Sequence, residues 1–234
     1  MTIKWDKDFA EKYYEADLVE KKYILGPIVK KIVQKTKGKN LIDLGCGSGY
    51  YCRPFAKLRK CVIGVDKNEE QLNIAISIEK KQKLGIKYVK ADITNLKSIK
   101  SSSQDIALLS FVLIETPSTK VVKKMFKEVY RVLRKGGILV VGNMHPHSIN
   151  VKSPVRYFNL KNKYSYFNNG AVGTSIAFLT NGKKLVFDKD YHYTLEFIVN
   201  SLIENKFTIT YVKEAAHREK LPTHIIIVAK KVSK

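Results

Sequence analysis

Three glycines at alternate positions follow an acidic residue, in the order Asp43, Gly45, Gly47 and Gly49. Because glycine has no Cβ, such a run lets the backbone adopt left-handed angles and approach a ligand closely. The short apolar run before it, residues 40–44, is typical of a buried strand. A helix after the turn would direct its free N–H groups and positive dipole end at the same ligand. The stretch therefore predicts a strand, a binding turn and a helix.

Two other glycine-rich patterns differ from this turn. In the dinucleotide-binding pattern G-x-G-x-x-G, the third glycine position would fall at Tyr50. A P-loop requires a lysine followed by serine or threonine, and no lysine follows these glycines. The turn therefore matches neither pattern.

Two further acids are placed to join the same site. Asp66 ends a predicted strand over residues 61–65, about 20 residues past the glycine turn, where a carboxylate can accept hydrogen bonds from both ribose hydroxyls. Asp92 follows a predicted strand over residues 86–90. Ligands of open α/β sheets bind outside the carboxyl ends of the strands, so the turn and both acids belong to one predicted site.

A helix-to-strand joint occurs at residues 132–139, with the sequence Val-Leu-Arg-Lys-Gly-Gly-Ile-Leu. Together with the acid-x-G-x-G-x-G pattern of residues 43–49 and with Asp66, this joint resembles the class I S-adenosylmethionine (SAM)-dependent methyltransferases. The similarity is to members that modify quinones and other small molecules, and it runs from about residue 38 to 145. It implies a doubly wound α/β fold with a mostly parallel seven-stranded sheet that has an antiparallel edge strand.

The resemblance also implies SAM as the cofactor and S-adenosylhomocysteine (SAH) as its product. In similar methyltransferases an N-terminal tyrosine covers the methionine end of SAM, and the acid after the third strand binds the adenine amino group. The positions implied for cofactor binding are Tyr14, Asp43, Gly45, Cys46, Gly47, Gly49, Tyr50, Asp66, Lys67, Asp92, Ile93, Ser110 and Phe111.

The remaining sequence predicts a cap, a domain and an insertion. Residues 1–36 form a predicted helical cap with a break or restart at Gly26-Pro27, and residues 37–234 form the methyltransferase domain. Asn169-Gly170 and Asn181-Gly182 are typical of hairpin turns, so residues 143–190 are predicted as a small antiparallel β insertion after the fifth strand. Its place above the strand ends makes it a predicted substrate lid.

Periodicity and turn residues outline the other elements. Pro54 indicates that the helix after the glycine turn begins near Cys52 or is kinked. The later predicted helices cover residues 69–83, 118–135 and 191–205, the first with a stop at Gly85. The later predicted strands cover 104–113, 138–142, 207–213 and 224–231, with 164–167, 171–179 and 184–187 in the insertion.

Histidines supply the candidate general bases. His145 and His147 follow the fifth predicted strand, and histidine titrates near neutrality. A base is needed only where the methyl acceptor must lose a proton. A histidine pair at a strand end also suits a metal, but no third ligand is evident, so no metal is predicted. For each histidine, a role limited to hydrogen bonding in a loop stays an alternative.

Composition limits the class of protein. The chain has 234 residues, 44% of them hydrophobic, which favours one α/β domain with an embellishment. No apolar run is long enough to span a membrane, and the charged start lacks the apolar centre of a signal peptide, so a cytoplasmic protein is expected. Three cysteines without C-x-x-C spacing argue against a zinc site or a disulfide framework.

The net charge of +22 suggests nucleic-acid binding at first sight. Arginine, which suits base and phosphate recognition, is rare, and the lysines are spread along the whole chain. Net charge informs on solubility and nonspecific binding rather than on fold. We therefore predict no specific nucleic-acid partner.

The prediction that follows is SAM-dependent methyl transfer to a small-molecule acceptor, by proximity and orientation with general-base help from a histidine. One alternative is an RNA or protein methyltransferase that uses the lysine-rich surface. An Asn-Pro-Pro-Tyr-like tetrapeptide after the fourth predicted strand would indicate methylation of the amino groups of bases or glutamine side chains. Residues 110–113 are Ser-Phe-Val-Leu instead, which argues against that activity. A second alternative is a SAM-binding protein without catalysis. A homodimer is compatible with the sequence.

Overall fold

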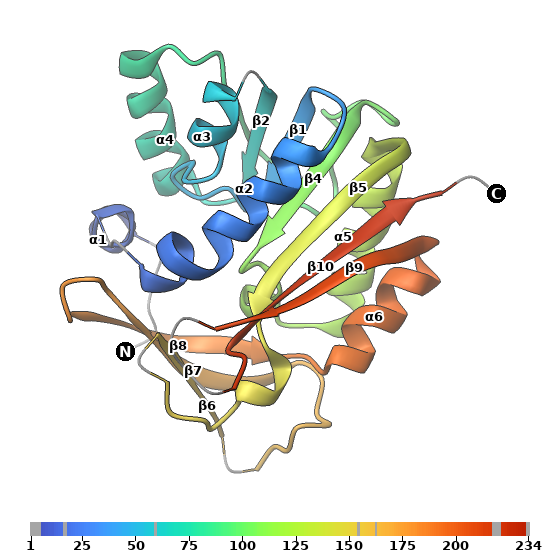
Figure 1. Cartoon of the computed structure of the whole chain (residues 1–234). Coiled ribbons are helices and arrows are strands. Elements are labelled where there is room, and N and C mark those ends of the chain that lie inside the picture. Colours follow the sequence, from blue (N-terminus) through green and yellow to red (C-terminus); the bar gives the residue numbers. More distant parts are fainter. Residues whose placement is uncertain are drawn as a thin grey trace.

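The computed structural model describes residues 6–15, 18–58, 60–153, 155–161, 163–216 and 221–232. A seven-stranded sheet in the order β3-β2-β1-β4-β5-β10-β9 forms its centre (Figure 1). The strands are β1 (Asn40–Leu44), β2 (Cys61–Asp66), β3 (Lys87–Lys90), β4 (Gln104–Ser110), β5 (Leu133–Met144), β9 (Phe207–Ala215) and β10 (His224–Lys231). Strand β10 is antiparallel to both of its neighbours, and the other pairs are parallel. The predicted fold class is confirmed, with the antiparallel strand next to the edge strand β9.

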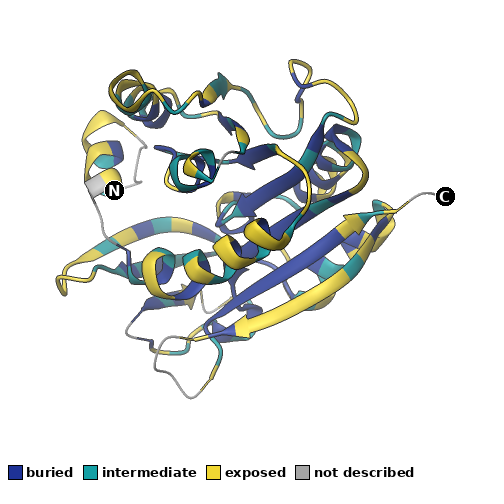
Figure 2. Ribbon diagram, turned by 45° about the horizontal axis from the view of Figure 1, so that its top comes forward, coloured by how far each residue is buried: buried dark blue, intermediate teal, exposed yellow. Residues whose placement is uncertain are grey.

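Helices cover both faces of this sheet. One core cluster joins the sheet to α5 (Thr119–Val132) and α6 (Leu195–Glu204). A second joins it to α2 (Gly26–Lys35), α3 (Cys52–Lys57) and α4 (Glu69–Gln82). Leu41 and Ile42 of β1 enter opposite clusters, because successive side chains of a strand point to opposite faces. The central strands are therefore buried on both sides, as Figure 2 shows.

The helix boundaries follow from single residues. Helix α3 begins at Cys52, as predicted, which places Pro54 in the first turn, where a missing N–H costs nothing. Helix α4 begins after Asn68, whose side chain accepts a hydrogen bond from the Gln71 N–H. It ends at Gln82 because Lys83 adopts a left-handed conformation. The stop predicted at Gly85 is therefore two residues too late.

The N-terminal part is more divided than predicted. Helix α1 (Lys7–Glu15) is separate from a π-helical turn, η1 (Glu20–Leu25), which runs directly into α2. Of the predicted break or restart at Gly26-Pro27, the restart is confirmed: α2 begins at Gly26 directly after η1, and Pro27 falls in its first turn, where it is tolerated.

Two other boundaries differ from the sequence prediction. Strand β4 ends at Ser110, and residues 113–115 form a short 3-10 turn, η2 (Leu113–Glu115), instead of more strand. Helix α5 ends at Val132, because Leu133 already pairs with Gln104 of β4. The register of β4 against β5 shifts between Gln104 and Ile106. The extra residues of β5, which include Gly136, bulge out of the pairing there.

The insertion is a three-stranded antiparallel sheet of β6 (Arg156–Leu160), β7 (Ala171–Phe178) and β8 (Lys184–His192). The hairpin at Asn181-Gly182 is confirmed, since Gly182 has φ +81° between β7 and β8. The hairpin at Asn169-Gly170 and the strand over 164–167 are wrong: Asn169 instead accepts a hydrogen bond from the Thr194 N–H. Thr194 caps α6, which starts at Leu195 because β8 continues to His192.

Within the described ranges, no helix is long and apolar enough to cross a bilayer.

Candidate active site

A cavity of about 410 Å³ opens at the carboxyl ends of β1, β2, β3 and β4. This volume lies within the range of about 300–1,000 Å³ that small-molecule sites occupy. All predicted cofactor positions except Tyr14 and Gly49 line it, namely Asp43, Gly45, Cys46, Gly47, Tyr50, Asp66, Lys67, Asp92, Ile93, Ser110 and Phe111. Positions 49 residues apart in sequence, such as Asp43 and Asp92, thus share one cavity because parallel strands end at the same edge.

The glycine turn is shaped by close approach of its neighbours. Gly45 has φ +71°, and a Cβ there would lie 2.5 Å from Cγ2 of Val112. Gly49 has φ +80°, and a Cβ there would collide with the Tyr88 hydroxyl. Gly49 therefore allows the turn to pack on β3, while Gly45 and Gly47 line the cavity.

Asp66 links the glycine turn to the second strand. Its Oδ2 accepts a hydrogen bond from the Gly47 N–H and its Oδ1 from the Asn68 N–H, each at 2.8 Å. Burial raises the pKa of this carboxyl above its usual value. Each carboxylate oxygen has a second lone pair, so Asp66 can hold the turn and still accept hydrogen bonds from a ligand.

The other two predicted acids differ in environment. Burial raises the pKa of Asp43 to about 7, although the Cys52 thiol donates to its Oδ2 at 3.2 Å. At Asp92, burial acts in the same direction, but hydrogen bonds from Thr94 outweigh it and hold the pKa below its usual value. Asp92 is therefore a full carboxylate at neutral pH.

An N-terminal tyrosine lines the cavity, but it is Tyr13 rather than Tyr14. The Tyr14 side chain is 42% exposed, and its ring lies 5.9 Å from the Arg53 guanidinium. Adjacent residues of a helix point about 100° apart, so only one of the two can face the cavity. Tyr13, rather than the predicted Tyr14, is therefore the N-terminal tyrosine that lines the cavity.

Glu115 is a cavity residue that the sequence analysis missed. It ends the η2 turn after β4. Water reaches its carboxyl from the cavity, but the surrounding protein raises its pKa to about 8, and the nearby charges of Asp190 and Asp66 add to this. Its place just past the fourth strand, at the edge where the other acids gather, was the available signal.

Lys21 is a second missed residue. Its ammonium lies 4.1 Å from the ring centre of Tyr13 and 5.6 Å from that of Tyr50. Burial lowers the pKa of this amine to about 8. Among the residues that the structure describes, Lys21 has no ion-pair partner. In a chain with so many lysines, no sequence signal separates this one.

Gln71 adds an unpaired acceptor to the cavity. It is 2% exposed, and its Nε2 donates to the Ala10 carbonyl at 3.4 Å. Its Oε1 has no hydrogen-bond partner within the described part of the chain. Because a buried polar atom without a partner is costly, this oxygen indicates a place for a ligand donor.

The two histidines predicted as general bases are not among the described residues that line the cavity. His145 is buried, and its Nε2 lies 2.9 Å from Glu214 Oε1 while its Nδ1 accepts the His147 backbone N–H. Burial and the neighbouring His147 lower the pKa of His145. The contact between His145 and Glu214 thus joins the end of β5 to β9. Across the described ranges, no group of three or more His, Cys, Asp or Glu side chains is arranged to hold a metal.

A doubly wound sheet with a glycine turn after β1 and acids after β2 and β3 defines the class I SAM-dependent methyltransferase fold. Residues 42–141 match the family described as a methyltransferase domain. The chain therefore has this fold and, over residues 42–141, matches a methyltransferase domain, and SAM is the cofactor that this similarity implies.

Three known proteins are similar to this chain. It is 27% identical over 129 residues to the ubiquinone biosynthesis O-methyltransferase of Pelagibacter ubique, a match that spans 53% of this chain and 52% of that protein. A solved SAM-dependent methyltransferase from Clostridium acetobutylicum has a TM-score of 0.68 at 18% identity, over 88% of this chain and 89% of that one. The cyclase SpnF has a TM-score of 0.62 at 16% identity, over 88% and 82%. At these identities the two solved structures establish the fold alone.

Proposed function

We propose that this protein transfers the methyl group of SAM to a hydroxyl group of a small-molecule acceptor. One observation carries the proposal: a single cavity contains all but two of the predicted cofactor positions together with Glu115, a carboxyl whose pKa of about 8 suits proton transfer near neutrality. The similarity to an O-methyltransferase supports a hydroxyl as the acceptor group. The match spans about half of that relative, so the activity itself is part of the proposal.

The cavity residues fit SAM. The glycine turn leaves room for close approach, and Asp66 keeps lone pairs for the ribose hydroxyls. Asp92 is ionised and can accept from the adenine amino group, and the unpaired Gln71 Oε1 can accept from a further donor. When bound, SAM supplies an activated methyl group on a sulfonium.

We assign the proton transfer to Glu115. An ionised Glu115 can take the proton of an acceptor hydroxyl, and the Lys21 ammonium can stabilise the oxygen anion that remains. Both groups are held in the cavity, so orientation comes from the fold rather than from the acceptor. The insertion over about 143–190 is proposed as the lid over the acceptor.

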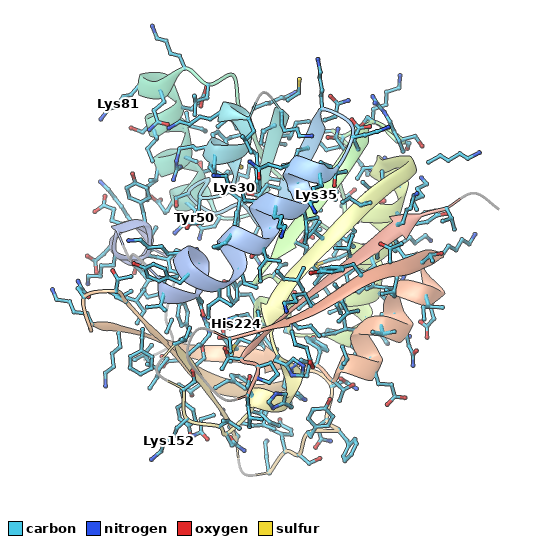
Figure 3. All side chains as sticks on the ribbon, viewed as in Figure 1. Lys30, Lys35, Tyr50, Lys81, Lys152 and His224 are labelled. Atoms are coloured by element: carbon cyan, nitrogen blue, oxygen red, sulfur yellow. The ribbon has the colours of Figure 1, made fainter. Side chains whose placement is uncertain are left out.

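The charges favour a small molecule over RNA. The described lining carries four carboxyl groups, those of Asp43, Asp66, Asp92 and Glu115, against the ammonium groups of Lys21 and Lys67. Because the pKa values of Asp43 and Glu115 are about 7 and 8, the charges of this lining roughly balance near neutrality, and it offers a phosphate backbone no excess of positive charge. Figure 3 shows Lys30 and Lys35 on α2, Lys81 at α4 and Lys152 near the insertion, so these lysines do not form one track.

Calorimetry and labelled methyl transfer test the proposal. SAM and SAH should bind and NAD should not, because Tyr50 occupies the third glycine position of the dinucleotide pattern. Label from SAM should pass to a small-molecule extract, and not to total RNA, at about 0.15 M salt, where the screening length is about 8 Å. Stoichiometric label in a defined RNA would favour the RNA alternative. Binding of SAH without transfer to either fraction would favour a non-catalytic SAM-binding protein.

A further inference from the structure

Five buried polar side chains meet outside the cavity lining, and we refer to them as the buried ion cluster. They come from five separate elements and are each less than 5% exposed: Glu20 of η1, Arg156 of β6, Ser175 of β7, Asp190 of β8 and His224 of β10. The cluster therefore joins the N-terminal segment, the insertion and the last strand of the main sheet. The label of His224 in Figure 3 marks its place, where β10 comes close to the insertion.

Arg156 is the centre of this cluster. Its Nη1 donates to Glu20 Oε1 at 2.8 Å, and its Nη2 donates to Asp190 Oδ2 and to Ser175 Oγ, each at 2.8 Å. The second oxygen of Glu20 lies 3.4 Å from His224 Nε2. One planar guanidinium thus fixes two carboxylates from different parts of the chain, a task for which a lysine point charge is poorly shaped.

The guanidinium also contacts a wall of the cavity. The guanidinium carbon lies 5.6 Å from the ring centre of Phe111, which lines the cavity. It also lies 4.8 Å from the ring centre of Phe187. His224 packs edge-on against the Phe111 ring with the centres 5.8 Å apart. The Phe111 ring is therefore held by two members of the buried ion cluster.

Phe111 needs such support. Its φ is +58°, in the left-handed region that bulky residues rarely adopt, and its N–H donates to the Gly142 carbonyl at 2.8 Å. Strained backbone positions persist only where the surroundings hold them, and they gather at functional sites. The strain therefore points to a function for the contacts that hold Phe111.

The same guanidinium also acts on a second part of the cavity lining. Glu20 is followed directly by Lys21, whose ammonium lies in the cavity. Both belong to the π-helical turn η1, a rare type of turn that is frequently found at functional sites. Arg156 anchors this turn through Glu20 while it supports Phe111 through ring contact.

We propose that Arg156 is a positioning residue of the methyl-transfer site: it holds the Phe111 ring and the Glu20–Lys21 turn in place and so connects the insertion to the cavity wall. This inference rests on the proposed function only in that the cavity takes SAM and SAH. Stability alone gives a weaker reason for the cluster, because buried ion pairs can often be replaced by apolar residues without loss.

A double-mutant cycle on SAH affinity tests the inference by calorimetry, with circular dichroism as the check on folding. Arg156→Lys and Phe111→Leu should each weaken SAH binding, by about tenfold, and the double variant should lose clearly less affinity than the two single losses combined. Non-additivity is expected because Arg156 acts through the Phe111 ring. A role in folding stability alone would not produce it.

Arg131→Lys is the matched control. Arg131 also pairs with a carboxylate, that of Glu128, and donates to the carbonyls of Leu96 and Ile99, but it does not line the cavity. Arg131→Lys should lower the melting temperature and leave SAH affinity unchanged. Unchanged SAH affinity in Arg156→Lys, or losses that add in the double variant, would overturn the inference.

A second measurement keeps the inference testable if Arg156→Lys does not fold or if the wild type does not bind SAH. Hydrogen exchange of the Phe111 amide needs no ligand, and Ser175→Ala removes only one partner of Arg156. Faster exchange at Phe111 in Ser175→Ala, with no change in Arg131→Lys, is the expected result. Equal protection in both variants would refute the positioning role, whereas a wild type that fails to bind SAH refutes the proposed function instead.

Discussion

Glu115→Gln removes the proposed base with little change in shape. The glutamine keeps the size and polarity of the side chain but cannot take a proton. In the described part of the chain Glu115 forms no ion pair, so the fold should persist. We expect nearly unchanged SAH affinity and a fall in methyl transfer of about 10²–10⁴-fold, the usual contribution of a general base.

The pH dependence follows from the environment of this carboxyl. The pKa of Glu115 is about 8 because the surrounding protein and the nearby charges of Asp190 and Asp66 disfavour its ionised form. The base acts when ionised, so about a tenth of it is active at pH 7 and about a hundredth at pH 6. Below pH 8, kcat/KM should therefore fall close to tenfold per pH unit. The sulfonium of bound SAM favours the ionised form, so kcat at saturating SAM should have a lower midpoint.

The assay is transfer of labelled methyl from SAM to the extract fraction that the wild type modifies, measured across pH 6 to 9. Glu115→Gln should lose both the rate and its rise with pH. His145→Gln is the control, because its ring binds Glu214 outside the cavity lining, and it should keep the wild-type profile. A flat wild-type profile, or a profile that changes in His145→Gln and not in Glu115→Gln, would refute the assignment.

Three further variants test the geometry of the site. Asp66→Ala should weaken SAM binding by about 1.5–3 kcal/mol, as measured by calorimetry. It should also lower the melting temperature, because the Gly47 and Asn68 amides lose their acceptor. An affinity equal to that of the wild type would remove Asp66 from the site. The folded pKa of Asp43, about 7, lies above its unfolded value, so the carboxyl stabilises the fold below about pH 4 and loses this effect as pH rises to 7. Ligand-free Asp43→Asn should therefore gain up to about 4 kcal/mol above pH 7 in denaturant unfolding, and the gain should vanish near pH 4. Gly49→Ala should destabilise the protein by about 1–3 kcal/mol because of the positive φ at this position and the contact with the Tyr88 hydroxyl. Adding Tyr88→Phe should restore part of the lost stability. If it restores none, the φ strain alone causes the loss.

The parts of the site that the sequence predicted are local in origin. The turn from Asp43 to Gly49 and the acids Asp66 and Asp92 each follow a short strand, so pattern and spacing sufficed to place them at one edge. The choice between Tyr13 and Tyr14 depends on how α1 rotates against its neighbours, and periodicity left that open.

The parts that it missed depend on long-range packing. Strand β6 was not predicted because its pairing with β7 and the place of Arg156 in the cluster depend on residues far along the chain. The pKa of Glu115 is raised partly by the proximity of Asp190, 75 residues after it, and of Asp66, 49 residues before it. No local pattern encodes such a meeting.

The order of synthesis gives the buried ion cluster a further consequence. Glu20 and His224 are 204 residues apart, so a ribosome adding about 5–20 residues per second makes His224 about 10–40 seconds after Glu20. During that time Glu20 lacks His224 throughout and Arg156 for most of it, and a buried carboxylate without partners is costly. The nascent N-terminal segment should therefore stay undocked, accessible to chaperones and proteases, until the last strand is released.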